Sequence, residues 1–225
     1  MDEKNANIKE LVAKHWNRRA RLYDSTGHHD IHSAEQEEIW LKLIKAISGD
    51  KKLNVLDVGC GTGFLSLLFA KEGHKVTGVD IATNMLEKGK QKAKERGYII
   101  DFHIEDAESL SFKDDSFDLV VNRFLISNIS NPNKALIEWK RVLKPDGKLA
   151  IIEGEWRKRL YQNEFSEIDD SIPFYKGVSG EKLKSVMEKN FFQHVELNYL
   201  HDSLYWDEIP EFERYILLAN KYGEI

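Results

Sequence analysis

The pattern of apolar and polar positions predicts two amphipathic helices in the first fifty residues. Apolar residues recur three and four positions apart over residues 5–23, which places them on one side of a helix. A second helix is expected from Ser33, because Gln36 three residues later completes a capping-box pattern, and Gly49 stands where that helix should end. Residues 24–29 form a polar turn between the two helices. The apolar faces consist of Ile8, Leu11, Val12, Trp16, Ala20 and Tyr23, and of Ile39, Trp40, Leu43, Ile44 and Ile47.

Short apolar runs then alternate with helical patterns as far as residue 153. The repeated order of strand, helix and strand predicts a parallel sheet with helices on both faces and right-handed crossovers. Asn131 and the proline that follows it open the last of these helices, and a turn at residues 144–147 is expected to end it. The expected strands are residues 53–58, 75–80, 98–104, 117–121 and 148–153, and the other expected helices are residues 62–72 and 84–96.

The last third of the chain has a different pattern. Residues 154–180 are irregular and rich in aromatic side chains, so they are expected either to cap a small, partly apolar substrate or to cover the sheet edge. A helix is expected at residues 181–189, and strand-like runs at 192–200 and 212–220 are expected to finish the sheet as an antiparallel pair. The aromatic residues of the irregular segment are Trp156, Tyr161, Phe165, Phe174 and Tyr175.

Composition narrows the class of protein. The 225 residues suit one α/β domain with additions, and 41% hydrophobic residues are enough for a packed core. A formal charge of −5 disfavours a nucleic-acid partner, because phosphate binding needs a basic face. No apolar run approaches the about 20 residues that span a bilayer, and the first ten residues lack the apolar core of a secretory signal. The single cysteine, Cys60, excludes an internal disulfide. These features predict a cytoplasmic protein without a membrane partner.

The strongest chemical signal is a glycine-rich loop between a predicted strand and a predicted helix. Residues 55–64 read VLDVGCGTGF, and glycines in such a loop let a ligand approach the bare backbone beside the positive end of the helix. A dinucleotide fingerprint would place its third glycine where Phe64 stands, and a phosphate-binding P-loop would need Lys and then Ser or Thr after the last glycine. The spacing therefore favours neither NAD nor ATP.

Two acidic residues follow the next two predicted strands. Asp80 ends the second strand, where a carboxylate can accept hydrogen bonds from both ribose hydroxyls of a nucleoside. The alternative interpretation makes Asp80 the N-cap of the helix that follows. Asp106 follows the third strand and has the chemistry to accept from the exocyclic amine of an adenine, or it is a turn residue. The glycine loop favours the nucleoside interpretation of Asp80, and both interpretations of Asp106 stay open.

Four stretches in this order resemble the class I S-adenosylmethionine-dependent methyltransferases. They are VLDVGCGTGFLS, VTGVDIATNML, IEDAESLSFKDDSFDLVV and ALIEWKRVLKPDGKLAIIEG, within residues 53–154. The resemblance implies a doubly wound, mostly parallel seven-stranded sheet of order 3-2-1-4-5-7-6, with strand 7 antiparallel. It implies transfer of a methyl group from S-adenosylmethionine to a small-molecule acceptor. It also divides the single domain, residues 1–225, into an N-terminal helical lid at 1–50, a cofactor-binding core at 53–154, a substrate-cap insert at 155–180 and a C-terminal part at 181–225.

The resemblance also assigns roles to residues. The methionine part of the cofactor is expected to lie against the backbone of Gly59 and Gly61. Asp57 is expected to support this loop from beneath, and Cys60 to be a small residue within it. Asp80 is expected at the ribose, and Asn122 near the transferable methyl group. The remaining expected contacts are Ile81, Met85, Asp106 and Ala107 at the adenine, and Trp16, Arg19 and Tyr23 in a lid helix over the cofactor.

The sequence does not assign a catalytic residue. The methyl group of a sulfonium is already activated, so the enzyme mainly aligns the reactants, and a general base is needed only for a protonated acceptor. Glu153, His28 and Tyr23 are weak candidates; Glu153 is equally well interpreted as a strand-end carboxylate in solvent, and His28 as a solvated loop residue. No metal is expected, because the histidines at 28, 29 and 32 do not complete a ligand set. The alternatives are a non-catalytic S-adenosylmethionine-binding regulatory protein and, less favoured, an NAD-type oxidoreductase.

Overall fold

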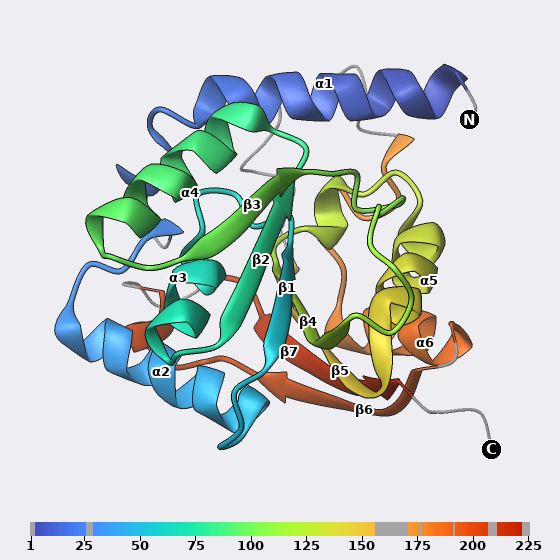
Figure 1. Cartoon of the computed structure of the whole chain (residues 1–225). Coiled ribbons are helices and arrows are strands. Elements are labelled where there is room, and N and C mark those ends of the chain that lie inside the picture. Colours follow the sequence, from blue (N-terminus) through green and yellow to red (C-terminus); the bar gives the residue numbers. More distant parts are fainter. Residues whose placement is uncertain are drawn as a thin grey trace.

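The computed structural model describes residues 3–25, 29–155, 171–175, 177–190, 192–206 and 211–221. They form a seven-stranded sheet in the order β3-β2-β1-β4-β5-β7-β6, in which β7 runs antiparallel to both neighbours and the other described pairings are parallel (Figure 1). The expected strand order is therefore confirmed. The strands are β1 (Asn54–Val58), β2 (Lys75–Asp80), β3 (Ile100–Ile104), β4 (Phe117–Arg123), β5 (Leu143–Gly154), β6 (Phe192–Tyr199) and β7 (Arg214–Lys221).

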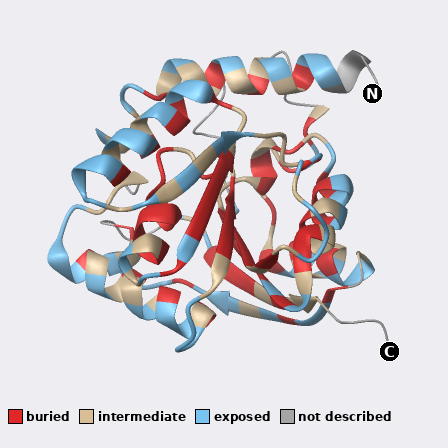
Figure 2. Ribbon diagram, in the orientation of Figure 1, coloured by how far each residue is buried: buried red, intermediate tan, exposed pale blue. Residues whose placement is uncertain are grey.

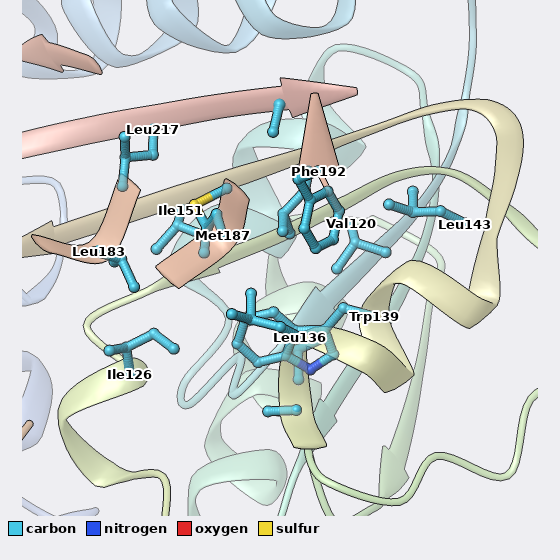
Figure 3. Close-up of a cluster of buried hydrophobic side chains, with 14 of the residues drawn as sticks. Val120, Ile126, Leu136, Trp139, Leu143, Ile151, Leu183, Met187, Phe192 and Leu217 are labelled. Carbon is cyan, nitrogen blue, oxygen red and sulfur yellow. The ribbon is translucent and has the colours of Figure 1, made fainter. Parts of the chain in front are cut away.

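Helices cover both faces of the sheet. One face packs against α2 and α3, and the other against α5 and α6, whose buried side chains Leu136, Trp139, Leu183 and Met187 meet the sheet residues Val120 and Ile151 (Figure 3). Figure 2 shows that the central strands are almost wholly buried. The helices are α1 (Glu3–Arg19), α2 (Ala34–Ser48), α3 (Phe64–Lys71), α4 (Thr83–Glu95), α5 (Pro132–Val142) and α6 (Gly180–Lys189), with short 3-10 turns η1 (Tyr23–Ser25), η3 (Ile126–Asn128) and η5 (Ser203–Tyr205). None of these described helices is long and apolar enough to cross a membrane.

Local sequence signals explain where the helices begin. The Ser33 side chain accepts from the Gln36 backbone N–H, as a capping box requires, and Gly49 closes α2 with a φ of 69°. The Gln36 side chain reaches one residue further back than the usual pattern, because it accepts from the N–H of His32 at 2.7 Å. Asn131 caps α5 by accepting from the N–H of Lys134.

The aromatic ring of Phe102 on β3 lies over three glycines from different elements. A methyl group added at Gly78 of β2 would lie 2.9 Å from this ring, and one added at Gly89 of α4 would lie 3.2 Å from it. A methyl group added at Gly63, which opens α3, would lie 3.6 Å away. Because Gly78 of β2 and Gly89 of α4 have no side chains, there is room for the Phe102 ring between these elements. The ring thereby links the edge strand β3 to the helix α4.

The expected turn at residues 144–147 is wrong. The strand β5 begins at Leu143, immediately after α5, and runs through Pro145 and Gly147. Leu143 pairs with Phe117, and the register shifts before Leu119 pairs with Lys148, so this stretch is an irregular strand start. A proline and a glycine look like a turn in isolation, but both are compatible with an irregular strand end.

Candidate active site

One cavity opens at the end of the sheet where β1, β2 and β4 finish. Its floor is the glycine loop after β1, its sides are the segments that follow β2, β3 and β4, and α1 with η1 lies over it. The carboxyl ends of the parallel strands all lie at this edge, which is where open α/β sheets bind ligands. The lining includes eight of the residues expected to contact a cofactor: Tyr23, Gly59, Gly61, Asp80, Ile81, Met85, Asp106 and Ala107.

The glycine loop exposes bare backbone to this cavity. Gly59 and Gly61 have φ values of 65° and 56°, a region that disfavours residues with a β-carbon. A methyl group at Gly59 would collide with Leu125, whereas one at Gly61 would have no protein atom within 4 Å. The loop is held to the sheet by the N–H of Cys60, which donates to the carbonyl of Val79 at 2.9 Å. Gly61 therefore leaves open space at the floor of the cavity.

Asp80 links this loop to the end of β2. Its carboxylate accepts from the N–H of Gly61 at 2.9 Å and from the N–H of Ala82 at 2.8 Å. Ala82, not Asp80, is the N-cap of α4, so the capping interpretation is wrong. Burial raises the pKa of the carboxyl, while the backbone donors favour its ionised form. Each oxygen keeps further acceptor capacity, and Asp80 lines the cavity, so a ribose contact fits the geometry and stays a prediction.

Asp57 does not line the cavity. Its carboxylate is 2% exposed and accepts from both the backbone N–H and the hydroxyl of Ser66 in α3, at 3.0 and 2.6 Å. Asp57 thereby holds the helix that follows the glycine loop, and its expected support of the loop from beneath stays a prediction. Burial raises the pKa of this carboxyl to about 7.

Asp57→Asn is expected to stabilise the protein above pH 7. Because the folded-state pKa lies above the ordinary value of 3.8, the stability that the protonated carboxyl provides is present in acid and is lost as the pH rises through about 7. Asn removes the buried charge and keeps an oxygen for Ser66. Urea unfolding should show a gain of about 2–4 kcal/mol at pH 8 that shrinks toward pH 4.

The control for this prediction is Asp118→Asn. The ammonium of Lys144 and the N–H of Asn54 hold the pKa of the Asp118 carboxyl below its ordinary value, so removing its charge should lower stability at pH 8. Equal changes in both variants would contradict the assignment of the effect to burial at Asp57.

Asp106 forms an ion pair with a lysine of α1. Lys9 of α1 donates to Asp106 at 2.7 Å and forms an ion pair with Glu108 at 2.7 Å. Glu108 is 2% exposed and also accepts from the hydroxyl of Ser130 and the N–H of Asn131 at the start of α5. The expected adenine contact of Asp106 therefore shares its carboxylate with Lys9. Lys9 is a cavity residue that the sequence analysis missed.

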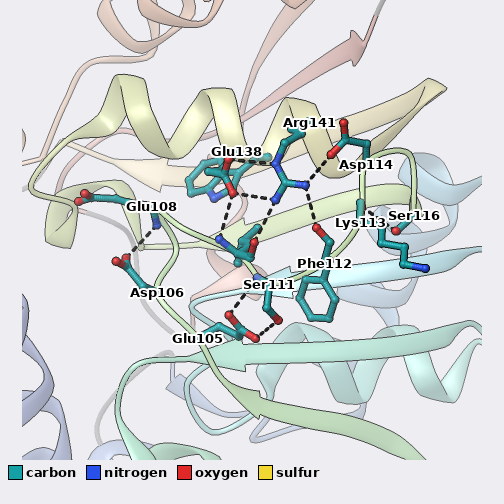
Figure 4. A network of polar contacts seen from close by, with 12 residues as sticks. Glu105, Asp106, Glu108, Ser111, Phe112, Lys113, Asp114, Ser116, Glu138 and Arg141 are labelled. Carbon is teal, nitrogen blue, oxygen red and sulfur yellow. Dashed lines mark hydrogen bonds and ion pairs between the residues drawn. The ribbon is translucent and has the colours of Figure 1, made fainter. Parts of the chain in front are cut away.

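A network of polar contacts fixes the segment that carries Asp106 (Figure 4). Arg141 of α5 donates to the carbonyls of Leu110 and Phe112 at 3.0 and 2.7 Å and pairs with Glu138 and Asp114. A guanidinium presents several donors in one plane, so a single side chain holds three acceptors of the loop (Leu110, Phe112 and Asp114) together with Glu138 of its own helix. The loop position of Asp106 is thus defined from beneath by α5.

Polar contacts also hold the lid over the cavity. The indole of Trp16 donates to Asn128 at 3.1 Å on one side, and Asn17 accepts two hydrogen bonds from Asn84 of α4 on the other. The helix α1 therefore spans the cavity from η3 to α4. Of the three expected lid residues, Trp16 and Tyr23 line the cavity, and Arg19 lies against the Trp16 ring at 5.8 Å.

Beyond the glycine loop the cavity is aromatic and basic. The rings of Tyr23 and His29 stack with centroids 4.1 Å apart, and both line the cavity together with Arg123 and Phe124. Burial, followed by the nearby arginines 123, 19 and 214, lowers the pKa of His29 to about 3. His29 is therefore neutral at physiological pH.

Three other expected site residues lie outside the described lining. Asn122 and Glu153 are both 0% exposed, and Cys60 is 7% exposed. The solvent-exposed interpretation of Glu153 is wrong, because the residue is fully buried and its Oε1 accepts from the N–H of Gly154. The Asn122 amide has no hydrogen-bond partner among the described residues. Burial raises the pKa of the Cys60 thiol well above its ordinary value, which agrees with an inert small residue.

The remaining candidates are His28 and the aromatic segment at residues 154–180, of which the structure describes only a part. His28 and residues 156–170 lie outside the described residues, so their expected roles stay untested. Within the described part, Phe174 is buried in the core beside α6, whereas Tyr175 lines the cavity. Phe174 thus favours the interpretation of this segment as cover for the sheet, and Tyr175 favours its interpretation as a cap for a ligand.

The fold and the cavity together define a doubly wound α/β protein with a cavity at the carboxyl edge of its sheet. Residues 56–151 match the protein family described as "Methyltransferase domain". That match, the motifs and the strand order support a class I S-adenosylmethionine-dependent methyltransferase domain in this chain. The cofactor of this family is S-adenosylmethionine.

A curated relative shares part of the chain. The demethylmenaquinone methyltransferase of Renibacterium salmoninarum is 39% identical over 135 residues, which cover 60% of this chain and 54% of the relative. The chain thus spans about half the length of that relative.

Solved structures share the fold at lower identity. Phosphoethanolamine N-methyltransferase 2 of Haemonchus contortus, in complex with phosphomonomethylethanolamine and S-adenosylhomocysteine, is similar with a TM-score of 0.72 and 19% identity over 96% of this chain and 60% of that chain. A cyclase, SpnF, is similar with a TM-score of 0.67 and 22% identity over 83% of this chain and 81% of that chain. One fold thus carries proteins named for different reactions, so the reaction has to be argued from the site.

Proposed function

We propose that the protein transfers a methyl group from S-adenosylmethionine to a small, partly apolar acceptor. The observation that carries the proposal is the cavity floor, where Gly61 leaves open space beside the carboxylate of Asp80. A nucleoside with an extended side chain fits such a floor, because bare backbone admits the chain and a carboxylate accepts from the sugar. The family match over residues 56–151 supports the same donor.

S-adenosylmethionine supplies a methyl group that its sulfonium sulfur already activates. The chain then has to bind and align the two reactants, and such alignment contributes up to about 7–11 kcal/mol. In this proposal Gly59 and Gly61 carry the methionine part, Asp80 the ribose, and the segment of Asp106 the adenine edge. The lid α1 excludes water from above through Trp16. Of the three candidates for proton transfer, only Tyr23 lines the described cavity.

The acceptor end of the cavity supports an aromatic acceptor. Tyr23, His29, Phe124 and Tyr175 present flat rings, which suit an apolar ring. The relative from Renibacterium salmoninarum is named for demethylmenaquinone. A demethylmenaquinone analogue with a short side chain is therefore the first acceptor to test.

The proposal includes a cytoplasmic location without nucleic-acid or membrane partners. The net charge of −5 and the single buried cysteine support it. It also keeps the division into a lid, a core, an insert and a C-terminal part, with the cavity between the lid and the core.

Calorimetry with S-adenosylmethionine and S-adenosylhomocysteine tests the proposal directly. Both should bind with one site per chain, while NADH should not bind, because the loop spacing disfavours a dinucleotide. A second assay follows S-adenosylhomocysteine formation with the reduced demethylmenaquinone analogue. If neither nucleoside bound, the proposal would fail; binding without product from a broad set of acceptors would favour a regulatory S-adenosylmethionine-binding protein.

A further inference from the structure

A partly buried group of cations and rings lies at the acceptor end of the cavity. The guanidinium of Arg123, the last residue of β4, lies 3.7 Å from the ring centre of Phe64 and 5.0 Å from that of Phe124. Trp40 adds a third ring at 5.7 Å. Aromatic faces stabilise a cation through their quadrupole, so these rings hold a positive charge in a place that is poor in water. Arg123 itself lines the cavity.

Two further arginines strengthen the positive field there. Arg214, at the start of β7, is 4% exposed and lies 4.5 Å from the ring centre of Trp206, which packs beside Phe124. Burial and then Arg214 lower the pKa of Arg123 to about 10, so Arg123 is still protonated at neutral pH. Arg19 of the lid acts on His29 together with both of them. Tyr23, Asp57 and Asp30 are the groups that act in the opposite direction on Arg123.

The charges along the cavity are segregated. Its described carboxylates, which are Asp80, Glu105, Asp106 and Glu108, lie at the end of β2 and in the segment after β3, where the nucleoside is proposed to bind. The end of β4 and the segment that follows it contribute Arg123 and no carboxylate to the described lining. The chain as a whole carries a net charge of −5, so the positive charge at this end of the cavity is local. It favours an anionic ligand over a neutral one.

We infer that Arg123 binds an anionic group of the methyl acceptor. The acceptor class is then a small aromatic molecule that carries a carboxylate, a phosphate or an ionised hydroxyl next to the reacting atom. This inference rests on the proposed function and narrows it. A guanidinium in a ring-lined pocket suits such a group, because its planar fork pairs with two oxygens and its desolvated charge favours an anion over a neutral analogue.

The test uses benzoate and phenyl phosphate as anionic probes and benzamide as the neutral counterpart, titrated into protein saturated with S-adenosylhomocysteine. At least one anionic probe should bind more than 10-fold tighter than benzamide. In Arg123→Gln this preference should fall by about 10- to 100-fold, the effect of one charge-assisted pair. Arg123→Lys should retain part of the preference because it keeps the charge. Arg18→Gln, at an exposed position of α1, is the matched control and should behave as the wild type.

A second titration separates the acceptor from the cofactor as the source of the anion. S-adenosylhomocysteine has a carboxylate, and methylthioadenosine lacks it. Arg123→Gln should bind both within about twofold of the wild type. Selective loss of S-adenosylhomocysteine would mean that Arg123 holds the cofactor carboxylate, and the inference would be overturned.

Equal affinity of the wild type for the anionic and neutral probes would also overturn the inference, as would an undiminished preference in Arg123→Gln. A purely structural role of Arg123 would lower the affinity for all probes alike and leave their ratio unchanged. If the wild type failed to bind S-adenosylhomocysteine, the proposed function would fail first, and the probes titrated without it would still report on Arg123.

Discussion

Asp80→Ala is expected to weaken S-adenosylhomocysteine binding by about 100-fold or more. The side chain is proposed to accept from two ribose hydroxyls, and each hydrogen bond to a charged group contributes about 1.5–3 kcal/mol. The same substitution removes the acceptor for the N–H groups of Gly61 and Ala82, so the loop that faces the ligand loses its tie to β2. Calorimetry on the folded variant measures the dissociation constant.

Two further variants serve as comparisons for Asp80→Ala. Asp80→Asn keeps the shape and one oxygen, so it should lose affinity but retain more stability than Asp80→Ala. Asp101→Ala removes an exposed carboxylate from the neighbouring strand β3 and should leave binding unchanged. An unaltered dissociation constant in Asp80→Ala would refute the ribose assignment.

Gly61→Ala should lose ligand binding while the protein remains folded. A β-carbon at Gly61 meets no protein atom within 4 Å, and it would occupy the open space of the cavity floor. Steric overlap of this kind costs about 1–3 kcal/mol, which corresponds to a loss of roughly 10- to 100-fold in affinity for S-adenosylhomocysteine. Calorimetry for binding and urea unfolding for stability are the two measurements.

Gly97→Ala is the matched control for Gly61→Ala. Gly97 lies after α4 with a φ of 72° and also has no protein atom within 4 Å of an added methyl group. Both substitutions place a β-carbon in the left-handed region, at a cost of about 1–2 kcal/mol in stability. Only Gly61→Ala should change ligand affinity, and equal affinities in the two variants would show that the floor is not where the ligand lies.

The sequence predicted those parts of the fold that local chemistry determines. Helix caps at Ser33 and Asn131, and the ordered alternation of strands and helices, were sufficient for the parallel sheet and most boundaries, whereas the strand order came from the resemblance of the motifs to a known family. The start of β5 was mispredicted because Pro145 and Gly147 carry the same local signal in a turn and in an irregular strand end.

The site was predictable where a residue follows directly from its strand end. Gly59, Gly61, Asp80 and Asp106 line the cavity as expected. Lys9 is 97 positions from Asp106 in the chain, and no local pattern connects a polar helix residue to a distant loop. The position of Arg123 could be inferred from the end of β4, but the rings around it come from α2 and α3, which only the tertiary structure brings together.

The ring of Phe102 has a consequence for protein engineering. Replacing a glycine inside a helix by alanine is a common way to raise thermal tolerance, and Gly89 looks like such an opportunity in the sequence. Its β-carbon would press on the ring of Phe102, and a β-carbon at Gly78 would press on the same ring. Improvement at either position therefore requires a smaller partner at residue 102, so the three sites have to be redesigned jointly.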